Sequence, residues 1–295
     1  MKRYAQAKHP HFQPVRLKCL RDVADYFTEP DMSQSALLNV MTRAVLKSAK
    51  ALVRDFGEVD KLQVSKKGAA NFVTNADLRT EKLLMEELGH ARPNFSFMTE
   101  ESGSIPGKDT SKRFCIDPID GTTNFMRAIP YFCVSVAAQE LQSDGTWASV
   151  AGVIYDPIHD ELFVAEKGHG ATVNNYKLHV ASRHEDALLS TSSPRKWREG
   201  YAQMVARLER VTDHGAVVRC SGSAALDLAY VAAGRLDGTW YHRLNSWDMA
   251  AGILLVREAG GVVAALDGGE VNMEAGSIVA ASPVIYPTLK GLLAA

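Results

Sequence analysis

Apolar residues recur at helical spacing soon after an unpatterned leader. From Leu37 to Phe56 they return every three or four positions, and Ser33 just before them is a good N-cap, so the spacing predicts a helix. A second helix is expected after Thr74, with Asp77 in its acidic first turn. Its apolar face is expected to comprise Leu78, Leu83, Leu84 and Leu88.

Short apolar runs bounded by turn residues follow these helices and are typical of strands. They cover residues 95–98, 113–116, 131–138, 150–154 and 161–165. In the second half, helix and strand patterns alternate. Helices are expected over 223–233 and 248–258, and strands over 238–242 and 262–265. The order of elements predicts a mixed α/β fold.

Residues 1–31 differ from the rest of the chain because they show no sustained hydrophobic period. One interpretation is an N-terminal appendage that is either disordered or upstream of the natural start at Met32. The alternative is a short helix near 17–27 that packs on the domain. No flexible linker divides the remainder, so residues 32–295 are expected to form one domain.

Composition excludes several classes of protein. The chain has 295 residues with a net charge of -1 and 46% hydrophobic residues, which argues against disorder and against a strongly basic nucleic-acid binder. No apolar run approaches the roughly 20 residues of a membrane span. The four cysteines are far apart and form no C-x-x-C pair, so neither a disulfide framework nor a cysteine-ligated zinc site is expected. The start carries no secretory signal, and a cytoplasmic location is expected.

The most informative segment is FCIDPIDGTTNF, residues 114–125. A strand is expected to end at Ile116. Asp117 and Asp120 follow, and their carboxylates suit a hard cation such as Mg²⁺. The backbone N–H groups of Gly121 and Thr122 would open a helix and suit an anion. Because carboxylates repel phosphate, the segment predicts a divalent cation between the aspartates and a bound phosphate. An Asp-Pro turn with an ordinary N-cap is the structural alternative.

Two further acidic residues are candidates for the same site. Glu100 follows an apolar run, and a strand–loop–strand path would bring it beside Asp117. There it would add a ligand and could accept a proton from water. Asp248 begins a predicted helix, and taken alone it is more typical of a helix cap than of a ligand.

Together, IDPIDGTTNF, the upstream EES and WDMAAGILLVREAGG resemble the inositol monophosphatase family, part of the lithium-sensitive, magnesium-dependent phosphatase superfamily. The likeness runs from about Ser33 to the C-terminus. It includes VTNAD at 73–77, GVIYDP at 152–157, GSAA at 222–225 and GSIVAA at 276–281. The resemblance implies a five-layer αβαβα sandwich of the inositol monophosphatase and fructose-1,6-bisphosphatase type, and a homodimer.

The resemblance also implies roles for individual residues around two or three Mg²⁺ ions. The implied metal ligands are Asp77, Glu100, Asp117, the carbonyl of Ile119, Asp120 and Asp248. The implied catalytic residues are Asp77, Glu100 and Thr122, of which Thr122 would hydrogen-bond the attacking water. The implied substrate contacts are Asp120, Gly121, Thr122, Gly222, Ser223, Ala224, Tyr241 and Asp248.

One position departs from the family pattern. Members that favour inositol phosphates carry a glutamate seven residues before the aspartate of the second motif, and here that position is Tyr241. A tyrosine can donate a hydrogen bond but cannot offer an acceptor-only carboxylate. Arg243 follows closely, and either contacts a second phosphate or carboxylate or is simply exposed.

The resulting hypothesis is a magnesium-dependent phosphomonoesterase that hydrolyses a small polyol or sugar-like phosphate by attack of activated water. Myo-inositol monophosphate is the leading substrate. Histidinol phosphate, fructose 1,6-bisphosphate and 3′-phosphoadenosine 5′-phosphate are the alternatives within the class. From another class, some bacterial relatives imply an RNA- or transcription-associated binding factor with residual phosphatase activity. The balanced charge favours a small phosphate ester over nucleic acid as the partner, and no membrane partner is expected.

Overall fold

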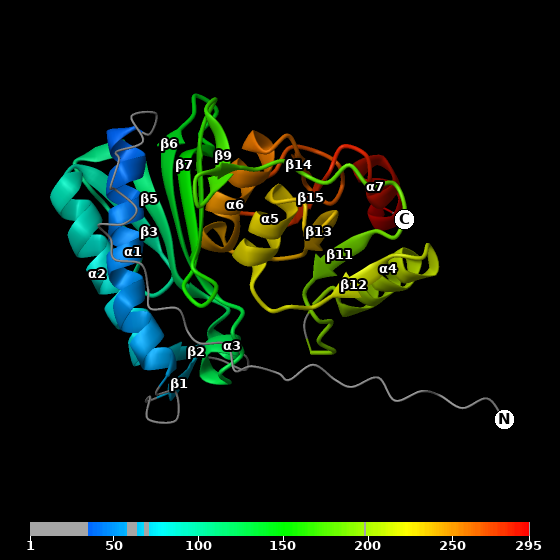
Figure 1. Ribbon diagram of the computed structural model, residues 1–295, viewed down its shortest axis with the longest axis horizontal. Coiled ribbons are helices and arrows are strands. Elements are labelled where there is room, and N and C mark those ends of the chain that lie inside the picture. Colours follow the sequence, from blue (N-terminus) through cyan, green and yellow to red (C-terminus); the bar gives the residue numbers. More distant parts are fainter. Residues whose placement is uncertain (1–34, 58–63, 68–70, 198, 295) are drawn as a thin grey trace, which may run out of the picture.

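Five layers of secondary structure stack in the order αβαβα in the computed structural model, which describes residues 35–57, 64–67, 71–197 and 199–294 (Figure 1). The outer layer next to the large sheet is formed by α1 (Ala36–Phe56) and α2 (Asn75–Ala91). The middle layer is formed by α5 (Ala224–Ala232) and α6 (Ser246–Glu258). The far layer is formed by α4 (Tyr201–Asp213) and α7 (Tyr286–Ala294). The αβαβα sandwich implied by the resemblance is confirmed.

The larger sheet has eight strands in the order β10-β9-β8-β7-β6-β5-β3-β4. Within it, β3 and β5 are parallel and the other neighbours are antiparallel. Its strands are β3 (Phe95–Thr99), β4 (Gly103–Ile105), β5 (Asp109–Asp120), β6 (Cys133–Leu141), β7 (Trp147–Asp156), β8 (Glu161–Glu166), β9 (Gly170–Val173) and β10 (Tyr176–Lys177).

The smaller sheet has five strands in the order β12-β11-β13-β15-β14. They are β11 (Leu188–Thr191), β12 (Val217–Arg219), β13 (Gly238–Tyr241), β14 (Val262–Ala264) and β15 (Ile278–Ala281). A separate hairpin pairs β1 (Val64–Lys67) with β2 (Asn71–Thr74), and α3 (Thr122–Met126) follows β5 directly. The mixed α/β prediction is therefore confirmed, with the predicted strands and helices found close to their expected positions.

One predicted element boundary needs correction, and the predictions for the N-terminal segment fall outside the described residues. The strand expected to end at Ile116 continues as β5 through Pro118 to Asp120. The first helix begins after Ser35, whose side chain accepts a hydrogen bond from the Leu38 amide at 3.1 Å. The predicted cap at Ser33 lies outside the described residues, as do the proposed appendage 1–31 and the possible helix within it.

The buried face of α2 differs from the predicted apolar face. Its buried positions are Ala76, Asp77, Thr80, Glu81, Leu84 and Leu88, whereas Leu78 is 48% exposed. These positions recur every three or four residues and follow one stripe of the helix. The stripe carries two acids among its apolar members. The face of α2 predicted from apolar residues alone therefore differs from the face that is buried.

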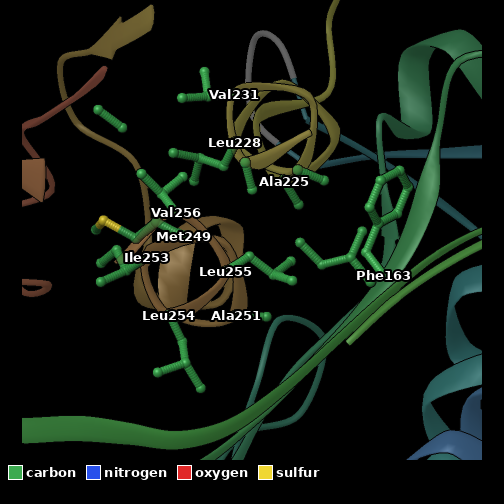
Figure 2. Close-up of a cluster of buried hydrophobic side chains, with 14 of the residues drawn as sticks. Phe163, Ala225, Leu228, Val231, Met249, Ala251, Ile253, Leu254, Leu255 and Val256 are labelled. Carbon is green, nitrogen blue, oxygen red and sulfur yellow. The ribbon is translucent and has the colours of Figure 1, made fainter. Parts of the chain in front are cut away.

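The middle layer is built for close contact between α5 and α6, as Figure 2 shows. Both helices are largely buried, and small residues line the surface between them. A Cβ built on Gly252 would lie 2.5 Å from Cβ of Leu228, so only glycine fits at this crossing. This contact fixes the start of α6, and with it Asp248, relative to α5.

No helix within the described ranges is both long and apolar enough to cross a bilayer. The cysteines at 115, 133 and 220 are free thiols.

Candidate metal centre

A bulge at the end of β5 brings two aspartates to the same face of the large sheet. Asp117 lies opposite Ser135 of β6. Asp120 lies opposite Cys133, so three steps along β5 match two steps along β6. Side chains alternate between faces along a strand, and residues three apart would normally point in opposite directions. The extra residue in the bulge returns Asp120 to the face that carries Asp117.

Asp248 completes a cluster with these two aspartates. One carboxylate oxygen from each of Asp117, Asp120 and Asp248 lies within 4.8 Å of the others. Asp248 is the third residue of α6, where it accepts a hydrogen bond from the Asn245 amide at 2.7 Å. It therefore serves the helix cap and the cluster at once. The structure thus brings the end of β5 and the start of α6, which are far apart in the sequence, to one place.

Glu100 and Asp77 lie beside this cluster. Glu100 follows β3, and its amide donates to the Ile116 carbonyl of parallel β5 at 3.2 Å, which holds the end of β3 against the aspartate segment. Asp77 is fully buried in the first turn of α2. The charges of both residues act on Asp117. The five acidic residues proposed from the sequence therefore share one region of the fold.

Burial and mutual repulsion raise the pKa values of these acids. Burial, with the charges of Asp248 and Asp77, raises the pKa of Glu100 to about 8. Burial and the charge of Asp120 raise the pKa of Asp248 to about 7. Burial, followed by the charge of Glu100, raises the pKa of Asp117 well above its usual range. Carboxylates gathered in this way repel one another until a cation lies among them.

Asp120 is held by the N-terminal end of α5. Its Oδ2 accepts hydrogen bonds from the Ser223 hydroxyl at 2.5 Å and from the Ala225 amide at 2.7 Å. Burial raises the pKa of Asp120, and the Ser223 hydrogen bond opposes that rise. Ser223 also caps α5 by accepting from the Leu226 amide at 3.3 Å. The hydroxyl of Ser223 is thus engaged in positioning Asp120.

The segment after Asp120 keeps the predicted turn into a helix. Gly121 is the N-cap of α3 with φ of 98°, and a Cβ there would lie 3.1 Å from the Tyr131 carbonyl oxygen. A residue with a side chain would be both strained and crowded at this position. The hydroxyl of Thr122 donates to the carbonyl of Ile119 at 3.0 Å. The proposed ligand carbonyl and the proposed water-binding hydroxyl are therefore adjacent.

A cavity of about 340 Å³ opens from the aspartate cluster toward β13. Asp120 and Asp248 line it, together with Gly222, Ser223 and Ala224. Its size suits a small phosphate ester. Six of the eight proposed substrate contacts line this cavity, whereas Gly121 and Thr122 are not among its lining residues.

Tyr241 lines this cavity, yet its hydroxyl is directed to the protein interior. It donates to Asp227 of α5, which is fully buried. Tyr131 donates to the other oxygen of the same carboxylate at 2.6 Å. Burial raises the pKa of Asp227 to about 6. Tyr241 therefore offers the cavity a ring rather than a free hydroxyl.

Three polar residues that sequence reasoning missed support the site. Glu81 is buried and accepts from the Glu101 amide at 2.9 Å and from the Ser102 hydroxyl at 2.5 Å, which fixes the loop that carries Glu100. The sequence feature that could have identified Glu81 is its spacing, which places an acid among the buried positions of α2. Asp227 showed the same signal, since it is an acid in an alanine-rich helix.

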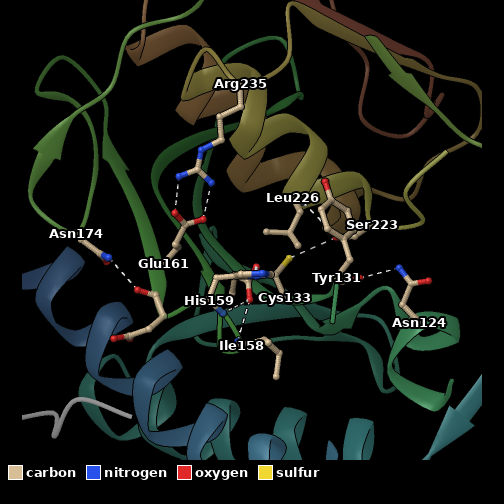
Figure 3. A network of polar contacts seen from close by, with 12 residues as sticks. Asn124, Tyr131, Cys133, Ile158, His159, Glu161, Asn174, Ser223, Leu226 and Arg235 are labelled. Carbon is tan, nitrogen blue, oxygen red and sulfur yellow. Dashed lines mark hydrogen bonds and ion pairs between the residues drawn. The ribbon is translucent and has the colours of Figure 1, made fainter. Parts of the chain in front are cut away.

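Asn124 is the third missed residue, and it joins two loops of the site. Its Nδ2 donates to the carbonyl of Tyr131 at 2.7 Å (Figure 3). The same nitrogen donates to the carbonyl of Ser221 at 2.8 Å. A Cβ on Gly222, which has φ of 91°, would lie 3.0 Å from that nitrogen. Gly222, a proposed substrate contact, thus packs against Asn124, which ties the Ser221 loop to the segment just before β6. A lone asparagine in a short helix carries no distinctive sequence signal.

Comparison with known proteins agrees with this geometry. Residues 33–295 match the model of the Inositol monophosphatase family. The chain is 47% identical over 260 residues to a Mesorhizobium japonicum protein named Inositol-1-monophosphatase, covering 88% of this chain and 96% of that one. It is 38% identical to Nus factor SuhB of Escherichia coli K12, covering 86% and 94% of the two chains.

A solved structure shows the same arrangement of elements. The extragenic suppressor protein suhB from Bartonella henselae superposes with a TM-score of 0.83 at 48% sequence identity, covering 88% of this chain and 98% of that one. The likeness therefore extends over the domain that carries the acidic cluster and its cavity.

Proposed function

Because this chain belongs to the inositol monophosphatase family, we propose that it is a magnesium-dependent phosphomonoesterase whose substrate is a small polyol phosphate, with myo-inositol monophosphate as the first to test. The observation that carries the proposal is the meeting of Asp117, Asp120 and Asp248 in one cluster beside a cavity of suitable size. Relatives named as inositol-1-monophosphatases support the choice of substrate.

The donor set fits Mg²⁺. All the candidate ligands offer oxygen, and the carboxylates repel one another strongly enough to raise their pKa values. The proposed ligands of two or three ions are Asp77, Glu100, Asp117, the Ile119 carbonyl, Asp120 and Asp248. Bound Mg²⁺ supplies activation of a water nucleophile and stabilisation of charge on the leaving oxygen. The same acids would repel a phosphate in the absence of the cation.

The chain's own residues then orient the reactants. The hydroxyl proton of Thr122 is given to the Ile119 carbonyl, so the Thr122 oxygen presents lone pairs to the attacking water. By accepting a hydrogen bond from that water, Thr122 would turn a lone pair of the water toward phosphorus. Glu100 would accept the single proton that the water loses as it attacks. The amides of Gly121 and Thr122 bind the phosphate oxygens.

The test is phosphate release from myo-inositol monophosphate with Mg²⁺, with a chelator and with added Li⁺. We expect release only with Mg²⁺, and inhibition by Li⁺ in line with the superfamily. An Asp117→Asn variant should lose activity because it removes a carboxylate shared by the cluster. Metal-independent release, or full activity of this variant, would overturn the proposal.

A second candidate function is favoured by relatives named Nus factor SuhB. In that case the chain would act mainly as a transcription-associated binding factor with residual phosphatase activity. Capture of RNA polymerase or RNA by the tagged chain, with normal cellular function from Asp117→Asn, would support it. A homodimer is also proposed, and sedimentation of the purified chain tests it.

A further inference from the structure

The cavity beside the acidic cluster is lined by positive as well as negative side chains. Asp120 and Asp248 line it, and so do Arg195 and Arg243. Both arginines are exposed residues. The neighbouring His242 adds little charge, because burial and the charges of Arg207 and Arg243 lower its pKa. The two guanidinium groups therefore supply the positive charge of this lining.

Arg243 is held at the cavity by its backbone. It has φ of 67°, a left-handed conformation that costs free energy in a residue with a side chain. The next residue, Leu244, donates its amide to the Gly276 carbonyl at 2.8 Å. A Cβ on Gly276 would lie 2.2 Å from the Leu244 carbonyl oxygen, so the loop and this glycine are in close contact. The loop between β13 and α6 therefore carries Arg243 on one side and leads directly to Asp248.

The guanidinium of Arg243 has a partner that an anionic ligand could replace. It forms an ion pair with Glu199 at 2.5 Å, and the Glu199 side chain is 80% exposed. Exposed pairs of this kind contribute little free energy, so replacement of Glu199 by an anionic group of a ligand would cost little free energy. The guanidinium of Arg195 lies 5.8 Å from the centre of the Trp197 ring. A cation–π contact does not use the N–H groups that bind an anion.

The position expected to recognise a polyol offers no carboxylate. Tyr241 lines the cavity, and its hydroxyl is bound to Asp227. Sugar hydroxyls at that place would lack the acceptor that a glutamate provides. Binding free energy for the part of the substrate that does not react must come from other groups, and the arginines are the charged groups available there.

We propose that Arg195 and Arg243 form a second anion subsite, and that the preferred substrate is a phosphate ester with a further phosphate or carboxylate group. The inference rests on the proposed phosphatase function, because it places the reacting phosphate at the acidic cluster. With Mg²⁺ bound, the acidic cluster and the two arginines of this cavity would both attract anions, and a substrate with two anionic groups would use both. Guanidinium groups bind carboxylate and phosphate oxygens through paired hydrogen bonds, so either anion satisfies the site.

Four probes test the subsite with Mg²⁺ present. Myo-inositol monophosphate and glycerol 2-phosphate have uncharged remainders, 3-phosphoglycerate adds a carboxylate, and fructose 1,6-bisphosphate adds a second phosphate. We expect a higher kcat/KM for at least one doubly anionic probe. Arg195→Gln and Arg243→Gln should each lower that kcat/KM about tenfold relative to glycerol 2-phosphate, mainly through KM, as the loss of a charged hydrogen bond predicts. The probe with the larger loss identifies the second anion.

Two variants complete the experiment. Glu199→Gln should raise kcat/KM for the doubly anionic probe, because it removes the competitor for Arg243. Arg257→Gln is the matched control, since it removes an exposed arginine paired with Glu270 at 3.9 Å on the other end of α6. It should leave the ratio between probes unchanged.

The outcomes separate the inference from the function on which it rests. Magnesium-dependent hydrolysis that falls equally for all probes in the arginine variants, or falls for none, overturns the subsite alone. Absence of magnesium-dependent release from every probe overturns the phosphatase function and the subsite together.

Discussion

Ser223 donates its hydroxyl to Oδ2 of Asp120 at 2.5 Å, across 103 positions of sequence. The contact joins the first residue of the α5 cap to the last residue of β5. It couples the middle helical layer to the metal-binding strand, because the same hydroxyl also accepts from the Leu226 amide. One side chain therefore fixes both a helix start and a candidate ligand.

Replacing this serine should affect both stability and metal binding. Ser223→Ala removes a helix cap and a hydrogen bond to a carboxylate, and we expect a loss of about 2 kcal/mol in the free energy of unfolding. The Mg²⁺ concentration for half-maximal phosphate release should rise. Ser282→Ala is the control, because the Ser282 hydroxyl accepts from the Ile285 amide at 3.4 Å in the turn before α7. Equal Mg²⁺ requirements in the two variants would contradict the positioning role of Ser223.

Glu81 should act through the loop that carries Glu100. Glu81→Gln weakens the hydrogen bonds that hold Glu101 and Ser102, so we expect the Mg²⁺ requirement to rise roughly tenfold, as for other residues that orient metal ligands. Titration of activity with Mg²⁺ measures this. Glu86→Gln on the exposed side of α2 is the control, since Glu86 forms only a 4.0 Å pair with Lys82 among the described ion pairs. A normal Mg²⁺ requirement in Glu81→Gln would exclude the proposed role.

Stability without metal should fall as the pH rises. The folded-state pKa values of Glu100, about 8, and Asp248, about 7, lie above the ordinary values for these acids. The folded protein then binds more protons than the unfolded chain between about pH 4 and pH 8, so its stability decreases across that window. We expect Tm in chelator to fall from pH 5 to pH 8. Saturating Mg²⁺ should remove most of the fall, and a Tm that rises over this range in chelator would be inconsistent with the clustered acids.

The α5–α6 contact should tolerate no added methyl group. Gly252→Ala places a Cβ against Leu228, and we expect a loss of about 1–3 kcal/mol in unfolding free energy from overpacking. Gly291→Ala in α7 is the control, because no atom lies within 4 Å of the added Cβ. It should stabilise by about 0.5–1 kcal/mol through helix propensity. Chemical denaturation measures both, and a neutral Gly252→Ala would show that the helices can move apart.

Periodicity predicted a mixed α/β fold, and it located α1, α5, α6 and the strands around the IDPID segment because these depend on local information. Motif spacing pointed to Asp117, Asp120 and Glu100. The five layers and the metal roles of Asp77 and Asp248 came from the family resemblance. The bulge in β5 was not predictable, because a strand running through proline contradicts local preference. It depends on pairing with β6, which periodicity does not report.

The partners of buried polar groups also lay beyond sequence reasoning. The expected substrate role of Tyr241 took no account of Asp227, which receives its hydroxyl from a different layer of the fold. Likewise, Leu78 fitted an apolar face but is exposed, because the buried stripe of α2 includes Asp77 and Glu81. In both cases a tertiary contact outweighed the local pattern. The roles of individual site residues remain predictions.

The most direct measurement is Mg²⁺ binding and phosphate release by the wild-type chain and by Asp117→Asn in parallel. Calorimetric titration of Mg²⁺ and release from myo-inositol monophosphate should both be normal in the wild type and both be strongly reduced in the variant, while its folded state persists in chelator. Removal of one repelling carboxylate should even raise the Tm of the metal-free variant at pH 8. Undiminished Mg²⁺ binding or phosphate release by folded Asp117→Asn would contradict the account.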